Sequence, residues 1–468
     1  MNLSLETIQN IFFCTGARNQ ELLTLFKSQT ISFEYDERMA SFKALGLTKI
    51  SLAPVAICTT SGTAVAECIP AMLEAFYSKN PLLLISGDRP KKLHGTGSPQ
   101  TIDHEALTRS CRGTFLEMTL REFSDFSLKD PVYPVHINVL VDDTTAHEEK
   151  SLFHQEIKGF LDFLKGKKKP VFIFSHEDKS MRPLISEFKK TGLPFYAETL
   201  SGGRDLSYLQ SEKQLIDSIA SYDCVVRIGF TPLSKLWRML EKKPMPVFSF
   251  DSRSLSGLSY GEILPWTSEK ILSTPEWWSA LSALPINEDT AAVDNKLISL
   301  IDKYPHSEIA TFKRLHDLIG NEDLVFLGNS LVIRFFELVQ TRNLSIFGNR
   351  GVNGIDGQLA TAIGMALGTK KTVYCILGDI TTLYDLSSLR EMPLNLKLII
   401  INNQGGRIFD MLKLDKRIVM EHNIRFAEIC RGFVLSYGTE LSDLHRVQVL
   451  ELNPTQVETN EFLREWNL

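Results

Sequence analysis

The chain of 468 residues lacks several features that mark special classes of protein. Its 7 cysteines are scattered without a CxxC pair. This spacing argues against a disulfide framework and favours reduced thiols in a cytoplasmic protein. No apolar run approaches the roughly 18 residues of a membrane helix, so we expect no membrane span. The opening residues MNLSLETIQN show no basic segment followed by an apolar one, so no signal peptide is expected.

The chain also lacks an excess of basic residues. There are 51 lysines and arginines against 56 aspartates and glutamates, and the formal net charge is -5. Proteins that bind nucleic acid as their main partner present a net basic face, so we expect no nucleic-acid partner. No GxGxxG motif follows the early strands. Its absence excludes a nicotinamide-binding Rossmann protein.

The sequence does contain a repeated pattern of apolar strands, glycine-bearing turns and helices. The run PVAICTT at 54–60 is one such strand. Strands that are apolar on both faces are typical of parallel sheets covered by helices on both sides. At roughly 150 residues per domain, we predict three doubly wound α/β domains, at 1–150, 151–295 and 296–468. Residues 267–295 are predicted to form a helix followed by a linker.

The strongest local signal is the segment CILGDITTLYDLSSLREMPLNLKLIIINNQGG at 375–406. One apolar strand ends in Gly378 and Asp379, and the next ends in Asn402 and Asn403. Ligands of doubly wound sheets bind outside the carboxyl ends of the strands. Carboxylate, amide and carbonyl oxygens suit Mg²⁺, which keeps some positions for phosphate oxygens. The segment therefore favours a metal and phosphate site, although two ordinary strand ends with polar turns would have the same pattern.

Two further strand-to-helix turns carry charged residues. The run NRGVNGIDG at 349–357 places one arginine and three glycines in a turn, and such turns bind anions. Arg350 and the nearby Arg334 are candidates for pairing with carboxylates. In the first block, Glu37 stands where a strand meets a helix. Each feature also has an ordinary explanation, namely surface arginines beside a tight turn and a carboxylate that complements the helix dipole.

Taken in order, these segments resemble the 2-succinyl-5-enolpyruvyl-6-hydroxy-3-cyclohexene-1-carboxylate (SEPHCHC) synthase, or MenD, family of thiamine-diphosphate (ThDP) enzymes. The resemblance covers most of residues 11–140 and 320–410. It implies a pyrimidine-binding, a central and a diphosphate-binding domain. It also implies that ThDP lies between the first domain of one subunit and the third of another, in a homodimer or homotetramer. The segments that carry the resemblance are CTGARN, FEYDERMASFKALGL, PVAICTTSGTAVAECIPAMLEA, LLLISGDRP, PVHIN, GNSLVIR, NRGVNGIDGQLATAIGMALG, GDITTLYDLSSL and NNQGGRIF.

The resemblance assigns roles to individual residues. Glu37 matches the catalytic glutamate that forms a hydrogen bond with the aminopyrimidine ring of ThDP. The metal ligands for Mg²⁺ or Mn²⁺ would be Asp379, Asn403 and the carbonyl oxygen of Gly405. The implied cofactor-binding residues are Asn353, Gly354, Ile355, Gly378, Asp379, Ile380, Thr381, Asn403, Gly405, Gly406, Ile408 and Phe409. The implied substrate-binding residues are Arg18, Arg89, Gln100, Lys235, Ser330, Arg334 and Arg350.

The activity implied by the resemblance is a step of menaquinone biosynthesis. It decarboxylates 2-oxoglutarate and adds the succinyl-semialdehyde carbanion to isochorismate. Both substrates are dianions, which gives several basic side chains a reason to converge. The sequence departs from the family at Ala17, where serine is usual, and at Leu236, where a second basic residue is common. Two alternatives stay open, another ThDP-dependent 2-oxo acid decarboxylase or carboligase, and a non-catalytic paralogue that keeps the fold.

Overall fold

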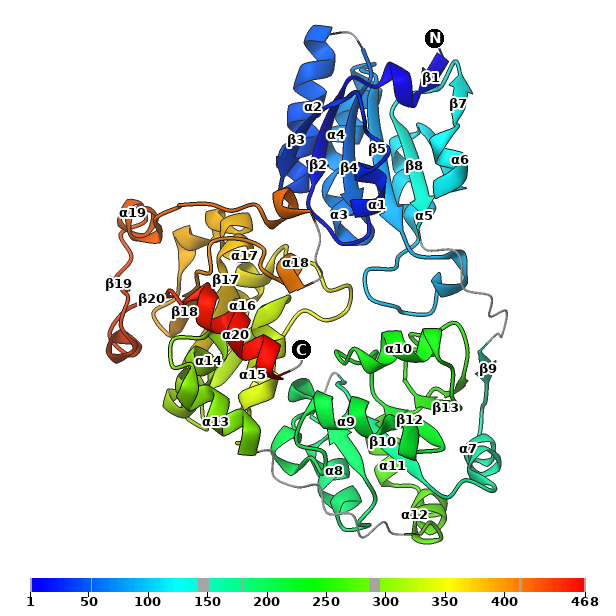
Figure 1. Cartoon of the computed structure of the whole chain (residues 1–468), viewed down its shortest axis with the longest axis vertical. Coiled ribbons are helices and arrows are strands. Elements are labelled where there is room, and N and C mark those ends of the chain that lie inside the picture. The colour runs from blue at the N-terminus through cyan, green and yellow to red at the C-terminus, as the bar shows by residue number, and fades with distance from the viewer. Residues whose placement is uncertain are drawn as a thin grey trace. The chain divides into compact units, whose positions relative to one another are not determined.

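The computed structural model describes residues 2–51, 53–141, 151–177, 180–285, 295–411 and 415–466. Over these residues the chain forms three six-stranded sheets, in each of which all neighbouring strands are parallel. A short antiparallel pair joins β1 (Asn2–Ser4) to β7 (Ser127–Lys129). Figure 1 labels these elements along the chain. The predicted α/β class with several parallel sheets is confirmed.

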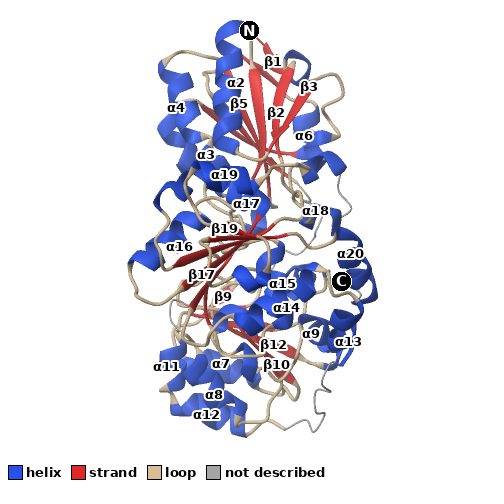
Figure 2. Cartoon of the chain, turned by 90° about the vertical axis from the view of Figure 1, so that its left-hand side faces the viewer, coloured by secondary structure: helices blue, strands red, loops and turns tan. Residues whose placement is uncertain are grey.

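The first sheet is buried on both faces. In strand β4, Ala56 and Cys58 pack into the core on one face. Val55 and Ile57 pack on the other face against helices α2 (Glu37–Ser51) and α4 (Ile69–Tyr77). Figure 2 shows these two helices on the same side of the strands. The strands, in sheet order, are β3 (Thr30–Glu34), β2 (Asn10–Cys14), β4 (Val55–Thr60), β5 (Leu82–Asp88), β8 (Val135–Leu140) and β6 (Thr114–Thr119).

The second sheet is covered in the same way. In strand β10, Phe172 and Phe174 face α7 (Ile157–Leu164) and α8 (Arg182–Lys189). Val171 and Ile173 of the same strand face α9 (Glu212–Ser218) and α10 (Leu236–Lys242). The strands, in sheet order, are β11 (Phe195–Ala197), β10 (Pro170–Phe174), β12 (Cys224–Ile228), β13 (Val247–Phe250), β14 (Glu262–Leu264) and β9 (Leu152–Phe153).

The segment predicted as one helix at 267–295 contains two helices. They are α11 (Ser268–Leu272) and α12 (Pro275–Ser282). Pro275 begins the second helix because proline has no backbone N–H to donate and disfavours a helical conformation in the residue before it. The predicted linker falls largely in 286–294, outside the described residues.

The third sheet repeats the topology of the first. When the strands of each sheet are numbered in chain order, both sheets have the order 2-1-3-4-6-5. The winding direction therefore reverses between β2 and β4 in the first sheet and between β15 and β17 in the third. Ligands of doubly wound sheets bind outside the carboxyl ends of the strands at such a switch point. The strands of the third sheet, in sheet order, are β16 (Ser345–Phe347), β15 (Leu324–Leu327), β17 (Val373–Gly378), β18 (Leu396–Ile401), β20 (Val449–Leu452) and β19 (Tyr437–Gly438).

The chain divides into two compact units. Unit 1 comprises Met1–Ala146, Arg350–Asp356 and Gln404–Ile424, and unit 2 comprises His147–Asn349, Gly357–Asn403 and Arg425–Leu468. Unit 1 holds the first sheet, and unit 2 holds the other two. The predicted domain boundary at 150 falls in 142–150, outside the described residues, and the one at 295 adjoins 286–294, which also lies outside them. The three domain ranges stay a prediction.

Two properties of the described residues bear on the expectations from composition. None of the described helices has both the length and the apolar character to cross a lipid bilayer. All seven cysteines are buried free thiols.

A buried histidine makes the stability of the fold depend on pH. His136 of β8 lies with its Nε2 2.8 Å from Ser86 Oγ, and burial lowers the pKa of its ring to about 3. An unfolded histidine titrates near pH 6.5. Between these two values the unfolded chain binds more protons, so stability falls on acidification, by up to about 1.4 kcal/mol per pH unit.

We therefore expect urea to unfold the protein more easily near pH 5 than near pH 7.5, and His136→Gln to narrow this difference. Urea unfolding followed by circular dichroism measures both. If His136→Gln shows the same difference in urea unfolding between pH 5 and pH 7.5 as the natural protein, then groups other than His136 cause that difference.

Candidate functional site

The predicted residues of unit 1 follow strands that end at one edge of the first sheet. Arg18 comes after β2, Glu37 after β3, and Arg89 directly after β5. The turn Ser61–Gly62 follows β4, so the switch point between β2 and β4 lies among them. The carboxyl ends of parallel strands meet at the same edge of the sheet, where doubly wound folds bind their ligands.

Arg18, Arg89 and Gln100 come together around one carbonyl group. Arg18 Nη2 and Arg89 Nε both donate to the Pro99 carbonyl oxygen, at 3.1 and 3.0 Å. Arg18 Nη1 also donates to Gln100 Oε1 and, at 3.4 Å, to Ser61 Oγ. Two planar guanidinium groups, each with several N–H donors, thus converge. Proteins use this arrangement to bind carboxylates.

Glu37 is a buried carboxylate and does not cap its helix. The backbone N–H of Met39 donates to Asp36 Oδ1 at 2.8 Å, so Asp36 supplies the carboxylate at the start of α2. Glu37 is only 8% exposed, and Thr59 Oγ1 of β4 donates to its Oε1 at 3.5 Å. A carboxylate that serves only the helix dipole does not need to be buried, and burial of a charge is costly unless it is compensated. The geometry therefore favours a role for Glu37 in a site.

The glycine-rich loop Arg350–Asp356 packs against the turn that follows β4. Thr63 Oγ1 donates to Asp356 Oδ1 at 2.7 Å. A Cβ at Gly354 would lie 2.3 Å from that Thr63 oxygen, so glycine is required there. Asn353 has φ of 68°, and its buried Oδ1 has no hydrogen-bond partner among the described residues. A buried amide oxygen in this state is costly until a ligand donates to it, as expected of a cofactor-binding residue.

The segment after β18 also belongs to unit 1 from Gln404 onward. Gly405 has φ of 140°, and a Cβ there would lie 2.7 Å from the Val419 carbonyl oxygen. The Gly405 carbonyl accepts a hydrogen bond from Arg407 N–H at 2.9 Å, and a carbonyl oxygen is a type of ligand that suits Mg²⁺. Gly406 lies close to the ring of Phe409, and Ile408 begins α18 (Ile408–Met411).

The other two predicted metal ligands lie in unit 2. Asp379 is 2% exposed and begins α17 (Asp379–Tyr384), with Ile380 and the buried Thr381 in its first turn. Asn403 follows β18, and its Nδ2 donates to Glu308 Oε2 at 3.1 Å, which turns the amide oxygen away from Glu308. A Cβ on Gly378 would meet no atom within 4 Å. Space is therefore present beside the Asp379 backbone.

Glu308 is a buried carboxylate beside the predicted metal ligands that the sequence did not reveal. It is the first residue of α14 (Glu308–Leu318) and is 1% exposed. Burial raises the pKa of its carboxyl to about 7; the Asn403 hydrogen bond lowers it and the Asp379 charge raises it. Two neighbouring buried carboxylates favour a compensating cation. From the sequence, a glutamate at the start of a helix is indistinguishable from a common dipole-complementing residue.

The donor set fits a hard divalent cation that is shared with a phosphate ligand. Asp379 and Asn403 offer carboxylate and amide oxygens. No group of three or more His, Cys, Asp or Glu side chains that could hold a metal is found in the part of the chain that the structure describes. A metal at this position therefore needs further oxygens, and the phosphates of a diphosphate cofactor supply such ligands to Mg²⁺.

Two predicted substrate residues of unit 2, Arg334 and Lys235, lie near the carboxylate of Glu212. Ser330 follows β15 with φ of 69°, and its carbonyl oxygen accepts a hydrogen bond from Arg334 Nη1 of α15 (Leu331–Val339). Burial and the nearby Arg238 lower the pKa of Arg334 to about 10, and Glu212 raises it. The backbone N–H of Lys235 donates to the same Glu212. Arg238 is a basic residue near Arg334 that the sequence comparison with the family did not single out.

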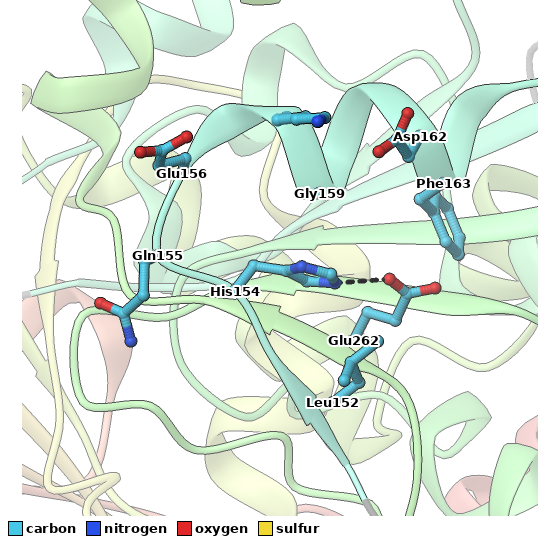
Figure 3. A pocket seen from close by; sticks show the side chains of 9 residues that line it. Leu152, His154, Gln155, Glu156, Gly159, Asp162, Phe163 and Glu262 are labelled. Carbon is cyan, nitrogen blue, oxygen red and sulfur yellow. Dashed lines mark hydrogen bonds and ion pairs between the residues drawn. The ribbon is translucent and has the colours of Figure 1, made fainter.

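A pocket of about 550 Å³ lies at the edge of the second sheet, beside β9 and α7. Figure 3 shows His154 reaching Glu262, with 2.6 Å between His154 Nε2 and Glu262 Oε2. A Cβ on Gly159 would lie 2.2 Å from His154 Nδ1, so glycine makes room for the ring. None of the predicted site residues lines this pocket, and the contact joins His154, directly after β9, to Glu262 of β14.

The chain is similar in sequence to known proteins of one family. A family model described as "Thiamine pyrophosphate enzyme, N-terminal TPP binding domain" matches residues 3–107. The 2-succinyl-5-enolpyruvyl-6-hydroxy-3-cyclohexene-1-carboxylate synthase of Bdellovibrio bacteriovorus is 30% identical over 98% of this chain and 96% of its own length. The synthase of the same name from Akkermansia muciniphila is 28% identical over 94% of this chain and 90% of its own length. The chain therefore belongs to the SEPHCHC synthase family, whose cofactors are ThDP and a divalent metal ion.

Proposed function

We propose that this chain is an active SEPHCHC synthase, which decarboxylates 2-oxoglutarate and joins the remaining four-carbon unit to isochorismate. The match over nearly the full length of relatives with that name supports the proposal. The observation that carries it is the convergence of Arg18, Arg89 and Gln100 at the sheet edge where the buried Glu37 lies. An anion site and a buried carboxylate at one edge are what a dianionic substrate and an activated cofactor require.

When bound, ThDP supplies the electron sink for decarboxylation and carbon–carbon bond formation. The protein then contributes positioning and charge. The Glu37 carboxyl would form a hydrogen bond with the aminopyrimidine ring and could exchange a proton there. Asp379, Asn403 and the Gly405 carbonyl would hold the metal. The residues that would hold the diphosphate and the rest of the cofactor are Asn353, Gly354, Ile355, Gly378, Ile380, Thr381, Gly406, Ile408 and Phe409.

The basic residues bind the substrate carboxylates. Arg18 and Arg89 offer bidentate donors, and Gln100 adds an amide. Lys235, Ser330, Arg334 and Arg350 complete the proposed substrate site. Each substrate carries two negative charges, and removing these charges from water is costly. Several cationic side chains are therefore needed to offset that cost.

We further propose that the active form is a homodimer or homotetramer in the cytoplasm. The family arrangement, in which two subunits share each cofactor, supports the oligomer. The seven buried free thiols are compatible with a reducing compartment. Light scattering of the purified protein measures the number of subunits. A fully active monomer would contradict a cofactor site shared by two subunits.

The decisive experiment is an assay of the purified protein with ThDP, Mg²⁺, 2-oxoglutarate and isochorismate. We expect isochorismate absorbance to fall as carbon dioxide is released. Carbon dioxide release with constant isochorismate would instead indicate another 2-oxo acid decarboxylase or carboligase. Calorimetric titration that shows no ThDP binding would indicate a non-catalytic paralogue.

Replacing Arg18 with glutamine tests the anion site. A charge-assisted hydrogen bond contributes about 1.5–3 kcal/mol, so we expect Arg18→Gln to raise the KM of at least one substrate about 10- to 100-fold. Steady-state kinetics with each substrate varied in turn measures the change. The exposed Arg121 of the same unit provides the control, because Arg121→Gln removes an equal charge outside the cluster. Equal kinetics in the two variants would rule out a substrate role for Arg18.

A further inference from the structure

A set of buried polar groups lies directly behind the arginine cluster. Asp88, the last residue of β5, is fully buried. Its Oδ2 lies 3.0 Å from His104 Nδ1 and 3.1 Å from His94 Nε2, and it accepts a hydrogen bond from Asn138 Nδ2 at 3.1 Å. Its Oδ1 accepts the backbone N–H of Arg89 at 2.7 Å. Asp88 thus holds the backbone from which one of the two substrate arginines projects.

His104 connects Asp88 to the turn after β4. The ring is 3% exposed. The backbone N–H of Gly62 donates to His104 Nε2 at 3.0 Å, so Nε2 is an acceptor and the proton is on Nδ1, which donates to Asp88. Both ring nitrogens are therefore used, and the ring cannot turn without losing two buried hydrogen bonds.

Gly62 in turn supports Gln100. Gly62 has φ of 90°, and a Cβ there would lie 3.2 Å from Gln100 Cα. The two backbones are therefore in close contact. Gln100 is itself held with φ of 59°, in the left-handed region that few side chains adopt, and its Oε1 accepts a hydrogen bond from Arg18. A shift of Gly62 would move Gln100 and, with it, the guanidinium of Arg18.

We propose that His104, held by Asp88, is a positioning residue that sets the geometry of the arginine site. One buried pair supports both sides of that site: Asp88 binds the backbone of Arg89, and His104 binds the turn on which Gln100 and Arg18 depend. The residue does not touch substrate; it acts through Gly62. This inference rests on the proposed role of the arginines in binding a dicarboxylate.

The test replaces the imidazole with a planar aromatic ring that forms no hydrogen bonds of this kind. We expect His104→Phe to raise the KM for isochorismate or 2-oxoglutarate at least about 10-fold while kcat changes by less than about 3-fold, because ground-state binding and not chemistry is disturbed. His104→Gln should restore most of the affinity, since an amide offers one donor and one acceptor. Unchanged KM values in His104→Phe would overturn the proposal.

The chain contains a matched control in unit 2. His316 is fully buried, its Nδ1 lies 3.1 Å from Asp317 Oδ1, and its Nε2 accepts the N–H of Thr341 at 3.3 Å. His316→Phe therefore removes the same pattern of bonds outside the cluster formed by Arg18, Arg89 and Gln100. We expect it to lower the thermal midpoint without raising either KM. An equal KM increase in both phenylalanine variants would show a general packing effect and overturn the proposal.

Two measurements keep the inference separate from the proposed activity. Calorimetric binding of 2-oxoglutarate to the protein loaded with ThDP and Mg²⁺ is measured in a Glu37→Gln background, where decarboxylation is suppressed, so it decides the inference even if isochorismate is not consumed. Asp88→Asn provides a second variant if His104→Phe does not fold. We expect it to weaken 2-oxoglutarate binding at least about 3-fold, because the neutral amide holds the His104 N–H less strongly. Unchanged binding in Asp88→Asn would also overturn the proposal.

Discussion

Exchange of Glu37 for glutamine will leave the protein folded but lower its turnover by about 100- to 10,000-fold, the range that proton transfer by a positioned side chain contributes. The variant keeps the size of the side chain and removes its ability to exchange a proton with the aminopyrimidine ring. Because Asp36 and not Glu37 caps helix α2, the helix should remain intact. Turnover at saturating ThDP, Mg²⁺ and substrates measures the effect, and circular dichroism checks the fold.

The neighbouring carboxylate is the control for this experiment. Asp36→Ala removes the bond to the Met39 N–H and should cost about 0.5–2 kcal/mol of stability, the usual contribution of a helix cap. It should leave turnover nearly unchanged. The two adjacent substitutions thus separate a structural carboxylate from a functional one. Near-normal turnover in Glu37→Gln would contradict the proposal that Glu37 activates the cofactor.

Exchange of Asp379 for alanine will abolish tight binding of the metal. Loss of groups that only orient a metal ligand costs about 10- to 100-fold in affinity, so loss of the ligand itself should exceed about 100-fold. Asp379 is 2% exposed and supplies the one carboxylate among the predicted metal ligands. Titration with Mn²⁺ in the presence of ThDP, followed by electron paramagnetic resonance, measures the affinity directly.

The control for the metal experiment is an exposed aspartate of the same unit. Asp302 lies on the surface of α13 (Asn295–Lys303), and Asp302→Ala changes the net charge by the same amount. We expect its Mn²⁺ affinity to match that of the natural protein. If Asp379→Ala binds Mn²⁺ as tightly as Asp302→Ala, then Asp379 is not a metal ligand.

The strands buried on both faces were the most predictable part of the fold. The run predicted at 54–60 is β4 (Val55–Thr60), because packing on two sides demands an unbroken apolar segment. The edge strand β6 (Thr114–Thr119) escaped prediction, since its side chains are only partly buried and its sequence TFLEMT has no continuous apolar run. The break between α11 and α12 was overlooked although Pro275 marks it.

The candidate site was predictable where its residues follow strands. Asp379 and Asn403 stand at strand ends, so the rule that places ligands at the carboxyl edge was enough to single them out. Glu308 and His104 could not be found in this way. Glu308 lies in a different part of the chain and reaches Asn403 only through folding, and His104 matters because a long-range bond joins it to Gly62.

The sequence by itself determined the α/β class, the repeated parallel sheets and the resemblance to ThDP enzymes, because these depend on local apolar patterns and on short motifs. It left open whether Glu37 was a site residue or a charge at the start of a helix. Only the tertiary structure shows that Glu37 is buried and that Asp36 caps the helix, since both depend on how distant segments pack. The pairing of Asp88 with His104 has the same origin. Hydrogen bonds between residues far apart in the chain leave no periodic pattern in the sequence.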